Sequence, residues 1–123
     1  MKPTVAELEI LGVLWRLGKA TVRQVHTELQ KAKPTGYTTA LKLMQIMVEK
    51  GLVVRDESER THVYRPAMKR KVAQRRLVAD LVDRAFGGSA AELVLQALSH
   101  KRASREEIAE IRRMLDEYEG GRR

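Results

Sequence analysis

Residues 35–54, TGYTTALKLMQIMVEKGLVV, decide the fold of this chain. A turn at Pro34 and Gly36 opens the stretch, and Gly51 ends the helix that the spacing of its apolar residues predicts. The ridge that this helix is expected to bury consists of Ala40, Met44, Met47 and Val48. The opposite face carries the polar residues Thr38, Thr39, Lys42 and Gln45. A helix with one buried side and one side of hydroxyls, an amide and a cation is suited to reading another molecule.

Two β-prone runs follow this helix, Leu52 to Arg55 and Thr61 to Arg65. The polar residues Asp56 to Arg60 lie between them. Pro66 ends the second run, because proline has no N–H to donate to a strand ladder. The pattern predicts a two-stranded hairpin. Such a hairpin is not stable alone, so we expect it to pack against helices.

Two helices are predicted before residue 35. Thr4 and Glu7 have the spacing of a capping box, and the first helix ends at Gly18. A second box at residues 21–24 begins a helix that runs to about Lys31. The apolar positions expected to face the core are Leu8, Leu11, Val13, Leu14, Trp15 and Leu17 in the first helix and Val22, Val25 and Leu29 in the second. Three helices followed by a hairpin predict a mainly α chain that begins with a winged helix-turn-helix.

Residues 69–123 are predicted to form a second, helical unit, separate from a winged-helix domain of residues 1–68. The basic run Lys69 to Arg76 opens it and is equally compatible with phosphate contacts and with a solvated helix face. Three short amphipathic helices follow, two of them started by capping boxes at residues 89–92 and 104–107. They offer little core to a monomer, so a second copy is expected to cover them, unless they fold back on the winged helix instead. The predicted dimerisation residues are Leu77, Leu81, Val94, Leu98, Ile111 and Leu115.

The composition favours a polyanion as the partner. Lysine and arginine number 24 against 16 aspartates and glutamates, which gives a net charge of +8. Nucleic acid is therefore the first partner to consider. The chain has no cysteine and only three histidines, far apart in sequence, so neither a disulfide nor a metal site is expected.

An enzyme is not expected, because no nucleophile, phosphate-loop or metallopeptidase motif occurs in the sequence, and no cofactor is implied. No apolar run approaches the length of a membrane span, and no signal peptide opens the chain. Membrane insertion is therefore not expected, and we expect a cytoplasmic protein.

Two groups of residues are candidates for contact with double-stranded DNA. The third helix of a winged helix-turn-helix enters the major groove. Its candidate readers are Tyr37, Thr38, Thr39, Lys42 and Gln45, and those of the wing are Arg60, Thr61 and His62. A threonine at a helix start can be a simple cap, but two threonines, a tyrosine and a lysine away from the core favour DNA. The alternative is a protein-interaction module with incidental DNA binding, which the acidic tip of the wing favours slightly.

Four motifs carry a family resemblance. In chain order they are Ala6-Glu7-Leu8-Glu9 with Leu14-Trp15, then Thr21 to Val25, then Tyr37-Thr38-Thr39 leading to Glu49 to Val53, and finally Val63 to Pro66. Their order and spacing resemble the penicillinase-repressor family of bacterial winged-helix regulators, which includes β-lactamase, methicillin-resistance and copper-transport repressors. The resemblance is looser in the last two helices.

This resemblance implies a homodimeric repressor that binds a dyad-symmetric operator through its N-terminal heads. It also implies control by a membrane sensor with a zinc metallopeptidase domain, through proteolysis in the dimerisation region. Two departures bear on that control. The copper-responsive members carry C-terminal cysteines, which this chain lacks. The antibiotic-responsive members are cut at an Asn-Phe bond where this chain has Gln96-Ala97, so cleavage there is not expected.

Overall fold

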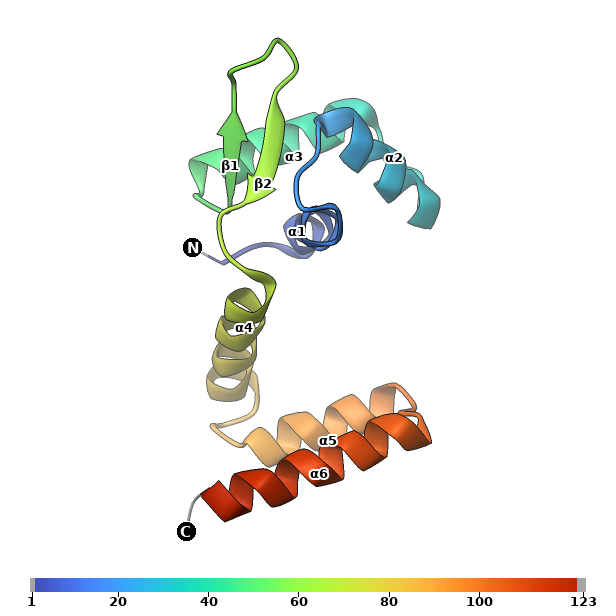
Figure 1. Ribbon diagram of the computed structural model, residues 1–123, viewed down its shortest axis with the longest axis vertical. Helices are drawn as coiled ribbons and strands as arrows, with labels where there is room; N and C mark the ends of the chain where they lie inside the picture. The colour runs from blue at the N-terminus through green and yellow to red at the C-terminus, as the bar shows by residue number, and fades with distance from the viewer. Residues whose placement is uncertain (1, 122–123) are drawn as a thin grey trace. The chain divides into compact units, whose positions relative to one another are not determined.

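The computed structural model describes residues 2–121 and is mainly helical, with a single two-stranded sheet among those residues (Figure 1). The elements in chain order are α1 (Val5–Leu17), α2 (Val22–Ala32), α3 (Tyr37–Glu49), β1 (Val53–Asp56), β2 (Val63–Pro66), α4 (Arg70–Ala85), α5 (Ala90–His100) and α6 (Arg105–Gly121). The chain divides into two compact units between Arg75 and Arg76. We call the first unit the head and the second the tail.

The head is a winged helix-turn-helix, as predicted, and its first two helices begin where the capping boxes are. The Thr4 hydroxyl accepts from the Glu7 N–H at 3.2 Å, and Glu7 Oε1 accepts from the Thr4 N–H at 2.8 Å. Thr21 and Gln24 repeat this geometry at the start of α2, again at 3.2 and 2.8 Å. Each box satisfies two amides that a helix start would otherwise leave unpaired.

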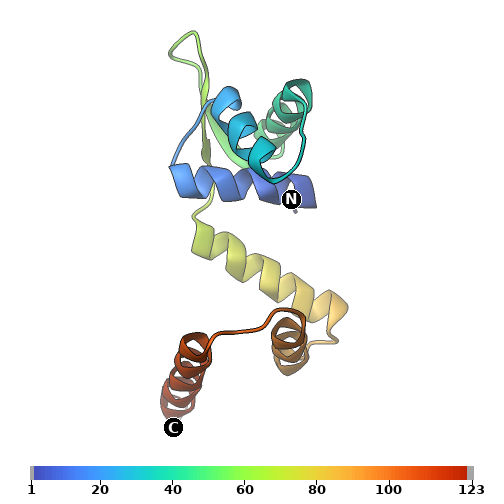
Figure 2. The same cartoon turned by 90° about the vertical axis from the view of Figure 1, so that its right-hand side faces the viewer.

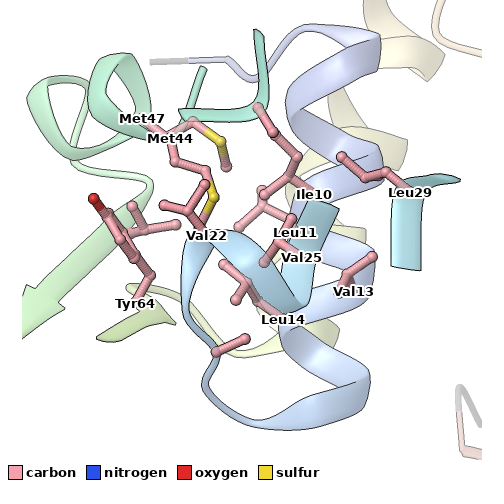
Figure 3. Packing of buried hydrophobic residues seen from close by; sticks show 13 residues of the cluster. Ile10, Leu11, Val13, Leu14, Val22, Val25, Leu29, Met44, Met47 and Tyr64 are labelled. Atoms are coloured by element: carbon pink, nitrogen blue, oxygen red, sulfur yellow. The ribbon is translucent and has the colours of Figure 1, made fainter. Parts of the chain in front are cut away.

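The core of the head lies between the three helices and the inner face of the hairpin (Figure 3). The predicted ridge of α3 is buried at Ala40, Met44 and Met47, whereas Val48 is only partly buried. Two positions in α1 differ from the prediction. Leu17 is 45% exposed, because it is the last residue of the helix and the chain turns away after it. Ile10, absent from the predicted face, is fully buried.

The hairpin pairs antiparallel, with Val53 opposite Pro66 and Asp56 opposite Val63. Both strands begin one or two residues later than predicted. The reason at β1 is that the Leu52 N–H donates to the Met47 carbonyl at 2.9 Å and so closes the end of α3. The loop between the strands, which we call the wing loop, projects beyond the helices of the head in both views (Figures 1 and 2).

Gly18 ends α1 with φ 87° and ψ −50°, a backbone conformation that strains any residue with a side chain. We expect Gly18→Ala to lower the free energy of unfolding by about 1–3 kcal/mol through this strain alone. Gly12, inside α1, is the matched control because a methyl group there also meets nothing within 4 Å. Gly12→Ala should stabilise the head by roughly 0.5–1 kcal/mol. Urea unfolding of both variants checks the pair, and equal effects would contradict the assignment of strain.

The tail contains most of α4 and all of α5 and α6. Ser89 caps α5 by accepting from the Glu92 N–H at 3.1 Å, and Ser104 accepts from the Glu107 N–H at 3.0 Å at the start of α6. None of the described residues of α4, α5 or α6 is buried. The large apolar side chains that this leaves exposed are Val72, Val78, Leu81, Val94, Leu95, Leu98, Met114, Leu115 and Tyr118. Among residues 2–121, no helix is long and apolar enough to span a membrane.

Candidate nucleic-acid interface

The packing of α3 turns its polar face to solvent. Met44 and Met47 are fully buried in the core of the head, which fixes the rotation of the helix about its axis. The residues that then lie exposed are Thr38, Thr39, Lys42 and Gln45, together with Tyr37, which is 42% exposed, and Glu49 at the end of the helix. All five predicted residues of this helix are therefore accessible to a large partner.

The predicted wing residues lie beside the start of α3. Arg60 and Thr61 are exposed, and His62 is partly exposed. All three line an open hollow of about 310 Å³ together with Tyr37. The structure thus brings four of the predicted site residues to one place. Lys42 and Gln45 do not line this hollow and lie further along the face of α3.

The start of α2 contributes residues to the hollow, and these were not among the site residues predicted from the sequence. Thr21 and Arg23 line it, with Val22, Leu41 and Tyr64 as the apolar part of its wall. One signal could have identified Arg23. It stands in the first turn of α2, where the helix dipole favours anions. The dipole therefore does not stabilise a cation at that position, which suggests that the cation has another role.

Tyr37 is held by two contacts from α2. The guanidinium carbon of Arg23 lies 5.8 Å from the centre of the Tyr37 ring, within the range of a cation–π contact. The His26 ring meets Tyr37 edge-on, with centroids 5.7 Å apart and an angle of 84° between the planes. His26 Nε2 in turn lies 2.6 Å from the carbonyl oxygen of Thr35 in the turn before α3. These contacts tie the first turn of α3 to α2.

The cations of the head differ in their partners. Arg16 and Lys31 both pair with Glu28 at 2.6 Å, and Lys33 approaches Glu9 at 3.7 Å. Within the described part of the chain, Arg23, Lys42 and Arg60 have no carboxylate within 4.0 Å. Part of the positive charge that is not neutralised within the protein therefore lies on the exposed face of α3, beside it at Arg23, and on the wing at Arg60.

The acids of the wing are mostly engaged by their neighbours. Glu57 lies 3.7 Å from Arg55 Nε and 4.0 Å from His62 Nε2. The Asp56 carboxylate accepts from the backbone N–H of Ser58 at 2.9 Å. This bond, with a contribution from the Ser58 side chain, holds the pKa of Asp56 below its usual range. Glu57 offsets part of any charge on His62, so the arginines carry most of the positive potential of the hollow.

Groups of three or more histidines, aspartates and glutamates close enough to hold a metal ion do not occur in residues 2–121. The predicted site residues on this surface carry hydroxyls, an amide, an imidazole and cations, whereas its acids lie at the end of α3 (Glu49) and on the wing. Hydroxyl, amide, imidazole and cationic groups donate hydrogen bonds to phosphates and to base edges in a DNA groove. The surface is thus chemically suited to nucleic acid.

Residues 3–117 match the model of a family described as penicillinase repressor. The transcriptional regulator BlaI of Mycobacterium tuberculosis is 31% identical over 118 residues, which is 94% of this chain and 83% of that protein. The penicillinase repressor of Staphylococcus aureus is 22% identical over 93% of this chain and 90% of its own. A solved structure titled as a CopR repressor covers 56% of this chain and all of its own, at 28% identity and a TM-score of 0.47. The members of this family are regulators of transcription; they are not enzymes. The chain belongs to the penicillinase repressor family.

Proposed function

We propose that this protein is a dimeric, sequence-specific DNA-binding repressor that binds a dyad-symmetric operator. The observation that carries the proposal is the exposed polar face of α3, bordered by three cations without carboxylate partners, Arg23, Lys42 and Arg60, within the described residues. Cations that are not paired within the protein can neutralise DNA phosphates, and this displaces counterions. The surface therefore supports DNA as the partner, and a cytoplasmic location follows from that role.

The division of labour on the head follows from the chemistry of the residues. In this proposal α3 lies in the major groove, where Thr38, Thr39, Lys42 and Gln45 reach base edges. Tyr37 and the wing residues Arg60, Thr61 and His62 contact the backbone and fix the register. Because phosphate contacts carry no sequence information, the preference for one operator comes from α3.

The tail would bring a second copy of the chain, with its own head, to the operator. Residues 1–68 would read DNA, and the helices of residues 69–123 would join two copies. The support for this part is that α4, α5 and α6 leave apolar side chains exposed and bury none of their described residues. A single head contacts too few base pairs to select one site in a genome, whereas two joined heads select a site of twice the length.

A protein-interaction module is the competing function, and the exposed surface of α3 discriminates between the two. A helix that docks a protein partner usually presents apolar anchors at helical spacing. The exposed face of α3 instead carries hydroxyls, an amide, a lysine and, at its end, Glu49, with Tyr37 as its only exposed large side chain that is partly apolar. This composition favours DNA.

Gel shifts on the promoter region of the protein's own gene test the proposal. We expect a shifted band that needs an intact dyad and that weakens steeply as salt is raised, because phosphate contacts release counterions. Binding that is absent, or that persists unchanged when the dyad is scrambled, would rule out sequence-specific repression.

Thr39→Ala and Lys42→Ala are expected to lower the preference for the operator over random DNA by roughly 1–3 kcal/mol each, because each removes a base contact. Competition gel shifts with operator and random duplexes measure this preference. Lys33→Ala is the matched control, since Lys33 is exposed but faces Glu9 of α1. Equal losses on both duplexes would show that Thr39 and Lys42 contact only the backbone.

Release from the operator by a sensor-linked signal completes the proposal. Family membership supports it, and a membrane sensor metallopeptidase would be the agent if the signal acts by proteolysis. Gln96 and Ala97, which stand in place of the family's cut bond, are exposed but lie inside α5. Immunoblots of cells before and after induction would show whether release shortens the chain, and a full-length chain after release would exclude proteolysis.

A further inference from the structure

We infer that the hollow between the wing loop and the first turns of α2 and α3 seats one phosphate of the DNA backbone. The inference rests on the proposed function and adds a defined anchoring point to it. The residues that would hold the phosphate come from three separate segments: Thr21 and Arg23 from the cap and first turn of α2, Tyr37 from α3, and Arg60 and Thr61 from the wing loop.

The size and the walls of the hollow favour a phosphate that belongs to a larger molecule. Its volume of about 310 Å³ lies at the lower limit of small-molecule pockets, which are usually enclosed and mainly apolar. This hollow is open, and most of its lining residues carry a hydroxyl, an imidazole or a guanidinium group. An anion delivered on a DNA strand can enter it without being enclosed.

The donors are suited to an anion. Two guanidinium groups, on Arg23 and Arg60, are fork-shaped donors that match phosphate oxygens. Neither has a carboxylate within 4.0 Å in the described part of the chain. The hydroxyl oxygen of Thr21 accepts a bond from the Gln24 N–H, which leaves its O–H proton to be donated outward. His62 is the weaker member because Glu57 lies 4.0 Å from its Nε2.

One side of the hollow is held in place before any ligand arrives. The guanidinium carbon of Arg23 lies 5.8 Å from the centre of the Tyr37 ring, and the edge-on contact of Tyr37 with His26 adds a second support for that ring. The bond between His26 and the Thr35 carbonyl continues this support into the turn before α3. A phosphate bound by Arg23 and Tyr37 would therefore fix the first turn of α3 relative to the groove.

The direct test is the double variant Arg23→Gln/Arg60→Gln. We expect it to bind operator and random DNA roughly tenfold or more weakly, with the preference between them nearly kept, because two charge-assisted bonds to a phosphate are lost. The slope of log affinity against log salt should fall by about one unit per lost phosphate contact. Lys31→Gln is the matched control, since it removes a cation from the other end of α2 that is paired with Glu28. Thermal unfolding of each variant verifies that the head is intact.

A chemical substitution in the DNA identifies the phosphate itself. Operators with a single neutral methylphosphonate at each backbone position in turn should include one position per half-site that weakens the wild-type protein about tenfold. At that position the double variant should lose no further affinity, because the phosphate charge that Arg23 and Arg60 would contact is already absent from the DNA. Full additivity at every position would overturn the seat.

Two further outcomes distinguish the possible failures. If the wild-type protein shows no operator binding at all, the proposed function fails, and the seat fails with it. If operator binding is normal but no methylphosphonate position couples to Arg23 and Arg60, only the seat is wrong. Titration of the wild-type protein with inorganic phosphate, followed by amide NMR shifts of the head, tests the other source of the anion. Tight phosphate binding without coupling to DNA would assign the hollow to a free anion and overturn the inference.

Discussion

A Leu98→Asp variant is expected to behave in light scattering as a 14.0 kDa particle, half the mass expected of the wild-type protein. It is also expected to bind the dyad operator on the order of a hundredfold more weakly, because the two heads no longer share one binding event. Leu98 is one of the exposed apolar residues of α5, and 37% of its surface stays accessible within the described chain.

The reason lies in the cost of a carboxylate at an apolar interface. A second copy that covers Leu98 would remove it from water, and an aspartate at that site would have to be desolvated without a partner. In the dissociated chain the same aspartate remains solvated on the surface of α5. The substitution therefore penalises the dimer far more than the monomer.

Val5→Asp is the control for this experiment. Val5 is 75% exposed in the first turn of α1, where an acid suits the helix dipole, and it belongs to the head. It should leave both mass and operator affinity unchanged. A wild-type mass of 14.0 kDa at working concentration would contradict the proposed dimer at once. A Leu98→Asp chain that stays dimeric would show that α5 lies outside the interface.

The helices of this protein could be predicted well because the signals for their ends are local. A capping box such as Thr21 with Gln24 involves residues only three positions apart, so it is readable in the sequence and recurs unchanged in the structure. The buried ridge of α3 is likewise a property of one helix. Leu17 was assigned to the core by the same spacing rule, which does not show that a residue at the very end of the helix has nothing to pack against.

The parts that could not be predicted depend on residues far apart in sequence. Arg23 and Arg60 line one hollow only because the hairpin folds back beside α2 and α3. Glu7 was predicted as half of a capping box, and that role is correct. The structure adds that Glu7 is almost fully buried and that Lys50, 43 positions later, donates to it. No local pattern contains such a pair.

Lys50→Met is expected to lower the free energy of unfolding of the head by about 3 kcal/mol, because it leaves a buried carboxylate without its partner. Lys50 Nζ lies 2.9 Å from Glu7 Oε1, and the side chains of Lys50 and Glu7 are 22% and 2% exposed. Lys50 also caps the carboxyl end of α3, where a cation suits the helix dipole. The pair therefore joins the end of α3 to the start of α1.

Urea unfolding followed by tryptophan fluorescence measures this effect. Trp15 is the only tryptophan of the chain, and it lies in α1 of the head, where its Nε1–H donates to the Met68 carbonyl at 2.9 Å. Lys33→Met is the matched control, because it breaks the exposed contact with Glu9 at 3.7 Å and should change little. Equal effects of the two substitutions would mean that burial of Glu7 does not matter.

The dependence on pH separates loss of the ion pair from loss of the lysine side chain's packing. Burial alone would raise the pKa of Glu7, but hydrogen bonds from Lys50 and from the Thr4 N–H outweigh it and hold the pKa below its usual value. The ionised pair therefore contributes stability fully above the unfolded carboxyl pKa of about 4.3, and this contribution is lost as pH falls further through the folded pKa. In Lys50→Met the buried carboxylate has lost that partner. Protonation of Glu7 therefore removes the free-energy cost of burying an unpaired charge in the variant. The difference in unfolding free energy between wild type and variant should thus be large at neutral pH and shrink on acidification below about pH 4. A difference that stays constant with pH would assign the effect to packing of the lysine side chain.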